Sequence, residues 1–272
     1  MQKSKKKYKR LAPIDRDRIE IKKTRAAIKK YMAAALKTKM ANIISQVIKA
    51  RAKIGKVDED TAKQIEDLIA SLTLEWGDIA EQMGDYLKEV ASDAVAEASI
   101  QIGFDREKAL TLANDRAVAW AEERGAELVG KKWVDGELVD NPNAEWAISE
   151  STRDMIASDI TTAMEEGMSN DELAALLEDN YAFSEDRAEM IARTETAVAD
   201  IQGNMELYNE ASENGIPILK QWITAEDDLV SEDCEMNGDS DPIELDELFP
   251  SGASEPPEHP NCRCDILPVI EE

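Results

Sequence analysis

The hydrophobic pattern of the chain is mainly helical. From residue 19 to residue 54, apolar residues recur at spacings of three and four with Lys and Arg between them, which predicts a basic amphipathic helix. Its apolar positions are Ile28, Tyr31, Met32, Leu36, Met40, Ile43, Ile44, Val47 and Ile48. Helical spacing continues over residues 58–99, 105–129, 144–166 and 184–214, and Ser169 and Glu172 have the spacing of a capping box at a helix start. These segments predict an extended helical N-terminal and central region.

Two other patterns interrupt the helices. Near residues 131–140, Asp135-Gly136 stands between Val134 and Leu138, which is typical of a β-hairpin turn. After Pro217, the short apolar runs ILKQWIT and CDILPVI favour strands, and the segment 225–261 between them is acidic and rich in turn residues. The sequence therefore predicts a mainly α protein that closes with a small C-terminal α+β module.

Charge divides the chain further. Residues 1–56 hold 19 Lys and Arg against three acids, a net charge of +16, whereas the remainder holds 13 basic and 55 acidic residues, a net charge of -42. We therefore expect three regions: a basic helical arm (1–56), an acidic helical region containing the hairpin (57–183), and the C-terminal module (184–272). We also expect the body to stay folded by circular dichroism when residues 1–56 are deleted.

The basic arm has several interpretations. It is a packed helix with a solvated lysine face, or it contacts nucleic-acid phosphates, an anionic membrane surface or an acidic protein. No apolar run approaches 18 residues, so no membrane span is expected. The Lys-rich start lacks the apolar core of a secretory signal, and three cysteines fit reduced thiols, so we expect synthesis in the cytoplasm.

The candidate chemistry lies in four side chains, which are the three cysteines and the single histidine of the chain. Cys234, His259, Cys262 and Cys264 form a familiar donor set for tetrahedral zinc, although a Cys-x-Cys spacing is tighter than usual. Reduced, partly buried thiols beside a proline-fixed turn are the alternative. A cysteine hydrolase using His259 is a weaker interpretation, because no orienting third group is identifiable.

A polar residue also interrupts the helix over 184–214. Its heptad rows contain one polar member, Thr194, flanked by Arg193 and Glu195. We expect Thr194 to bond a local carbonyl beside a surface Glu189–Arg193 pair, since polar residues on a helix seam commonly serve register.

Several linked motifs resemble one family. IARTETAVADIQGN, WITAEDDLV, NGD and PPEHPNCRCDILPV follow the order and spacing of phage Mu F-like head morphogenesis proteins, also called minor head or minor capsid proteins. The residues that carry the resemblance are Arg193, Thr194, Glu195, Trp222, Asp227, Pro260, Asn261 and Arg263. The chain departs from many relatives at Ser231 and Cys234, where they carry Arg and His. Because cysteine can also bind a metal, that departure remains compatible with a metal site. It argues against an acid–base role at this position.

The resemblance implies a structural virion component at the portal vertex rather than an enzyme. Its expected partners are the portal protein, the major capsid protein or both, and its expected role is head morphogenesis with genome packaging or delivery. Contact with DNA, if made, should be confined to residues 1–56. The alternatives are a metal-dependent or cysteine/histidine hydrolase, and a DNA-binding virion protein ejected with the genome.

We also predict how the C-terminal motif is used. Pro256, Pro257 and Pro260 should stiffen the approach to the last strand, which should lie beside ILKQWIT. Arg263 should pair with an acid of the module, with Glu195 and Asp227 as candidates. The segment would thereby tie the helix of Thr194 to the strands.

Overall fold

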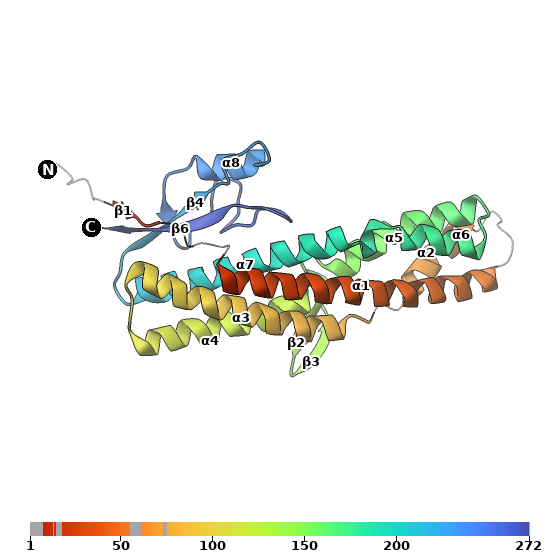
Figure 1. The fold of residues 1–272 in the computed structure, drawn as a ribbon, viewed down its shortest axis with the longest axis horizontal. Helices are drawn as coiled ribbons and strands as arrows, with labels where there is room; N and C mark the ends of the chain where they lie inside the picture. The colour runs from red at the N-terminus through yellow and green to blue at the C-terminus, as the bar shows by residue number, and fades with distance from the viewer. Residues whose placement is uncertain (1–7, 13, 15–17, 55–60, 73–74, 272) are drawn as a thin grey trace. The chain divides into compact units, whose positions relative to one another are not determined.

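The computed structural model describes residues 8–12, 14, 18–54, 61–72 and 75–271. The fold is mainly α with a small sheet near the C-terminus, as predicted (Figure 1). The helices are α1 (Ile19–Ile54), α2 (Thr61–Ser71), α3 (Gly77–Ile102), α4 (Glu107–Glu127), α5 (Ile148–Glu165), α6 (Asn170–Glu178), α7 (Glu185–Glu213) and α8 (Glu232–Gly238), with a 3-10 turn η1 (Tyr181–Phe183). The strands are β1 (Tyr8–Arg10), β2 (Lys131–Val134), β3 (Glu137–Asp140), β4 (Ile218–Ile223), β5 (Ile243–Glu244) and β6 (Asp265–Glu271).

Local sequence signals form as expected at the hairpin and at the start of α6. Strands β2 and β3 pair antiparallel, and both Asp135 and Gly136 have positive φ, as a tight primed turn requires. At α6, Ser169 Oγ accepts from the backbone N–H of Glu172, while the Glu172 carboxylate accepts from the backbone N–H of Ser169 at 2.7 Å. This capping box satisfies two amide groups that the helix itself leaves unpaired.

One predicted helix is interrupted. The expected helix over 58–99 is instead two helices, α2 and α3, with Leu72 and Trp76 in non-helical backbone between them. Both side chains are buried. The break in the helix allows both side chains to be buried. In a continuous helix, the helical period would fix the directions in which they point.

The chain divides into two compact units of discontinuous sequence. One unit contains Met1–Ala26, Gly84–Glu122 and Arg193–Glu272, and the other contains Ala27–Met83 and Glu123–Ala192. The three consecutive regions expected from sequence do not coincide with these units, because α1, α3, α4 and α7 each contribute residues to both. The folding independence of those three regions stays a prediction.

The sheet of the first unit has the strand order β1-β6-β4-β5. Strand β6 lies antiparallel to β4, which confirms the predicted pairing of the last apolar run with ILKQWIT. Strand β1 pairs with the other edge of β6, and helix α8 packs against β4 (Figure 1). Neither β1 nor α8 was predicted. The short strand β1 has no alternating apolar pattern in its side chains. It can still join the sheet, because the hydrogen bonds of a strand ladder are made by backbone groups.

Helix α7 crosses α3 closely in the same unit. At Gly203, a built Cβ would lie 2.3 Å from the carbonyl oxygen of Ala91 and 2.7 Å from the Cβ of Ala94. Ala199, Asp200 and Ile201 are consecutive and all buried, so the buried surface of α7 is wider than one seam, while Gln202 and Glu206 lie on a partly exposed stripe. The heptad interpretation therefore underestimated the burial of α7.

Helix α1 is an integral part of the core. In the second unit its residues Ile28, Met32, Leu36, Ile43 and Val47 are fully buried. Deleting residues 1–56 would remove these side chains from the core. This burial weighs against the expectation that the rest of the protein stays folded without residues 1–56, which stays a prediction.

Part of the positive charge of α1 and its approach is neutralised within the chain. Arg18 contacts Asp93 at 2.6 Å and Asp200 at 2.7 Å in the first unit. In the second unit, Lys29 lies 2.7 Å from Glu189, and Lys39 lies 2.8 Å from Asp78. The Lys-rich residues 1–7, on which part of the basic-arm prediction rests, lie outside the described residues. Acidic residues of the same chain thus pair with Arg18, Lys29 and Lys39, and they supply part of the acidic partner that the basic arm was expected to contact.

Candidate metal centre and the family motif

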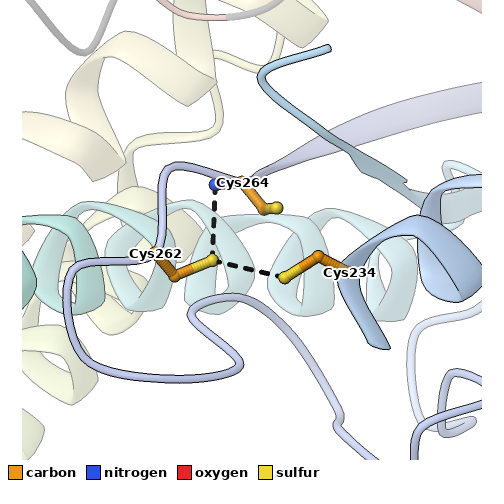
Figure 2. A group of neighbouring side chains, drawn as sticks. All are labelled: Cys234, Cys262 and Cys264. Carbon is orange, nitrogen blue, oxygen red and sulfur yellow. Dashed lines mark hydrogen bonds between the residues drawn. The ribbon is translucent and has the colours of Figure 1, made fainter. Parts of the chain in front are cut away.

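Three cysteines converge beside the start of β6. Cys234 lies on α8, whose first turn is capped by Ser231, since Ser231 Oγ accepts from the backbone N–H of Cys234. Cys262 and Cys264 lie in the loop that leads into β6. All three side chains are buried and point toward one another (Figure 2). The structure thus brings together residues separated by up to 30 positions in the sequence.

The sulfur atoms are close enough to share a ligand. Cys234 Sγ lies 3.6 Å from Cys262 Sγ, and the three sulfurs all lie within 4.8 Å of one another. His259 adds a nitrogen at the edge of this group, with Nε2 3.8 Å from Cys234 Sγ. All four side chains line one small pocket, which is also lined by Leu229, Val230 and Asn261. The four candidate ligands are therefore gathered in one place.

The thiols differ strongly in acidity. Hydrogen bonding by the Cys264 side chain lowers the pKa of Cys262 to about 5, and the backbone N–H of Cys264, 3.5 Å from Cys262 Sγ, acts in the same direction. Burial raises the pKa of Cys234, and the shared hydrogen bond with Cys262 raises the pKa of Cys264. Near neutral pH the group therefore contains one thiolate, Cys262, held by two thiols.

The polar residues of α7 hold the same loop. Thr194 Oγ1 accepts from the backbone N–H of Asn261 at 2.8 Å, and Arg193 Nη1 donates to Asn261 Oδ1 at 3.0 Å. Asn261 has a φ of 65°, in the left-handed region that asparagine tolerates better than most residues. Arg263 pairs with Asp227 through both carboxylate oxygens, while Glu195 is buried on α7. Helix α7 is thus tied to the loop that precedes β6, as the sequence predicted.

Two further motif residues, Trp222 and Pro260, lie near the cysteines. Trp222 is buried on β4, with its ring edge toward Phe249 at a centroid distance of 5.2 Å. The carbonyl oxygen of Pro260 lies 3.0 Å from His259 Nδ1. Each residue quoted for the resemblance therefore lies in or beside the loop, the helix or the strand that frames the cysteines.

The region that contains the cysteines and the polar residues of α7 resembles a known protein family. Residues 154–267 match the family model described as Phage Mu protein F like protein. Over these residues the chain is similar to phage Mu F-like proteins. The match runs from α5 to β6 and includes the cysteine group and the polar residues of α7. No curated protein and no solved structure matched the chain.

This similarity suggests a bacteriophage protein of head morphogenesis. In the part of the chain that the structure describes, every helix is too short or too polar to cross a bilayer.

The sequence analysis missed two buried polar residues that organise this phage Mu F-like module. Asn237 is fully buried, donates to Ser251 Oγ at 2.9 Å and to Glu258 Oε2 at 3.1 Å, and accepts from the backbone N–H of Ser251. Lys220 on β4 is 1% exposed and donates to the carbonyls of Leu245 and Ser254. Asn237 could have been found from the NGD motif, whereas Lys220 gives no local signal.

Proposed function

We propose that the protein is a minor component of the phage head, located at the portal vertex and bound to the portal protein, the major capsid protein or both. The observation that carries this proposal is the use of the family motif. Arg193 and Thr194 of α7 bind Asn261, and Arg263 of the same loop binds Asp227. Residues used in this way stabilise a surface for assembly, whereas a catalytic constellation needs groups that converge on a reacting atom.

Charge supports a protein partner for the acidic body. Residues 57–272 carry a net charge of -42, and a dense phosphate lattice would repel them. The module also exposes large apolar side chains, with Leu229 78% exposed and Leu248 62% exposed. Exposed apolar side chains mark a protein interface when they form one contiguous patch. The proposed contact with the portal or capsid therefore runs through the C-terminal module.

The hydrolase alternative has weaker support. Its nucleophile would be Cys234, which is the cysteine in contact with His259. Burial raises the pKa of Cys234, whereas the lowered pKa belongs to Cys262, and a cysteine nucleophile requires a lowered pKa and an adjacent base at the same residue. The non-enzymatic role is accordingly the better proposal.

The position in the particle can be tested with purified virions and with heads assembled without the portal protein. Mass spectrometry should find the protein at low copy number in virions and procapsids. Heads that lack the portal should lack this protein as well. Absence from virions and procapsids would refute the structural role, and full retention in portal-free heads would refute the portal location.

The interface can be tested by substitution. Leu229→Asn and Leu248→Asn should reduce incorporation into heads, because they remove exposed apolar anchors. Ile100→Asn is the matched control, since Ile100 is equally exposed but lies on α3. Equal incorporation of all three variants would exclude the C-terminal module as the contact.

Contact with DNA is a second proposal, which rests on the exposed lysines of α1. These are Lys22, Lys23, Lys30, Lys37 and Lys49. Lys30→Gln with Lys37→Gln should weaken binding and reduce the slope of log affinity against log salt by about 0.9 for each phosphate that the variant no longer neutralises. Lys108→Gln with Lys132→Gln, which changes exposed lysines elsewhere, should leave the slope unchanged.

A further inference from the structure

We propose that Cys234, His259, Cys262 and Cys264 bind one zinc ion in a tetrahedral site that fastens α8 to the loop before β6. The donor set consists of three sulfurs and one imidazole nitrogen, which favours zinc over the hard cations magnesium and calcium. The site is structural, because the chain supplies all four ligands and no coordination position stays open for a substrate.

Two of the separations between the ligand atoms match those of a tetrahedral zinc site. With zinc–sulfur bonds of about 2.3 Å, two sulfurs of one tetrahedron lie roughly 3.8 Å apart, and a sulfur and an imidazole nitrogen lie roughly 3.5 Å apart. The observed separations are 3.6 Å between Cys234 Sγ and Cys262 Sγ, and 3.8 Å between Cys234 Sγ and His259 Nε2. Cys264 Sγ lies within 4.8 Å of both other sulfurs. Small side-chain rotations would complete the site.

The histidine is held in the form that binds a metal. Its Nδ1 lies 3.0 Å from the carbonyl oxygen of Pro260, which can only accept a hydrogen bond. Nδ1 must therefore carry the proton in this contact, and the lone pair of the neutral ring belongs to Nε2, the atom beside Cys234. An imidazole that donates its second N–H to a carbonyl is the usual arrangement around protein-bound zinc.

The surroundings suit the charge of a bound zinc thiolate site. Three thiolates and Zn²⁺ carry a net charge of -1, and the Arg263 guanidinium lies near Cys262 and Cys264. Trp222 lies next to Cys264, and its indole N–H acts as a hydrogen-bond donor toward this sulfur. Metal binding would convert Cys264 to a thiolate, which is a better acceptor for such a donor than a thiol.

The position in the fold gives the ion a role. Between β4 and β6, the described chain has α8 and the two-residue strand β5 as its regular elements. A metal that joins α8 to the loop before β6 would close this segment of more than 40 residues, as structural zinc does in other small modules. This role requires no catalysis and does not depend on the location of the protein in the virion.

The first test measures metal in the full chain after purification under reducing conditions without chelator. Elemental analysis should find near-stoichiometric zinc, and Cys262→Ser should lose it. Met236→Ser is the matched control, because Met236 is an exposed sulfur-containing residue two positions after Cys234 on α8. It should retain the zinc. Wild-type protein without metal that also fails to take up added zinc would overturn the proposal.

A second measurement covers the case in which Cys262→Ser fails to fold. Chelator should lower the melting temperature of the wild-type protein, and added Zn²⁺, but not Mg²⁺, should restore it. Cobalt added to the chelated protein should give the intense visible absorption of tetrahedral Co²⁺ with thiolate charge transfer. An unchanged melting temperature with chelator, or after replacement of all three cysteines by serine, would show that no metal supports this fold.

Discussion

Replacing Gly203 with alanine would place a methyl group where α7 crosses α3. The new Cβ would lie 2.3 Å from the carbonyl oxygen of Ala91 and 2.7 Å from the Cβ of Ala94. The nearer obstacle belongs to the backbone of α3, so it cannot rotate away as a flexible side chain could. The two helices would have to move apart.

The cost follows from the size of that movement. Real Cβ atoms essentially never approach another heavy atom more closely than 3.0 Å, so the crossing must open by at least about 0.7 Å. Overpacking of a tight core costs about 1–3 kcal/mol, and a clash against backbone belongs at the upper end of that range. Alanine returns about 1 kcal/mol through its higher helix propensity. We therefore expect Gly203→Ala to reduce the free energy of unfolding by about 1–2 kcal/mol.

The assay is urea denaturation followed by circular dichroism, with Gly84→Ala as the matched control. Gly84 also lies inside a helix, but a Cβ there would meet its neighbours at 3.6 Å, which is ordinary van der Waals contact. Gly84→Ala should therefore stabilise the protein by about 0.5–1 kcal/mol. If both variants were stabilised equally, the close approach of α7 to α3 would be refuted.

The remaining predictions concern the contacts of the loop before β6. Thr194→Val should reduce stability by about 1–3 kcal/mol, because the backbone N–H of Asn261 loses its acceptor, and Thr194→Ser, which keeps the hydroxyl, should reduce it less in the same urea assay. Hydrogen bonding by Arg263 lowers the pKa of Asp227 in the folded state. Its contribution is therefore complete above the ordinary aspartate pKa of about 3.9 and is lost as the pH falls through the lower folded-state value. Melting temperatures measured from neutral to acid pH should lose this component in Asp227→Asn and keep it in Asp228→Asn; the same pH profile in both variants would exclude the pair as its source.

Much of the local structure was contained in short-range sequence patterns. The helical spacing over residues 19–54 gave α1, the Ser169 and Glu172 pair gave the start of α6, and Asp135-Gly136 gave the hairpin. These features depend on residues within a few positions of one another, where side-chain periodicity, capping and turn conformation act directly. The pairing of β6 with β4 could also be predicted from the sequence, because the C-terminal module contains two apolar runs that favour strands.

Other features were decided by the tertiary structure. Strand β1 joins the sheet through backbone hydrogen bonds, which leave no pattern in side chains. The burial of α7 beyond a single seam depends on its close packing against α3, which Gly203 by itself does not predict. The burial of α1 likewise could not be separated from a solvated basic arm by periodicity, since both interpretations share one amphipathic pattern.

The candidate site combines both levels. The sequence named the four metal-capable residues by their rarity and clustering, and it named Asp227 as one of two partners for Arg263. It could not determine that Cys234 lies 3.6 Å from Cys262, or that His259 presents Nε2. Those facts depend on the path of a 25-residue segment whose course is held by Asn237 and its partners. Sequence proximity fixes which groups are available, but the distances among distant groups are fixed by the packing of the intervening chain.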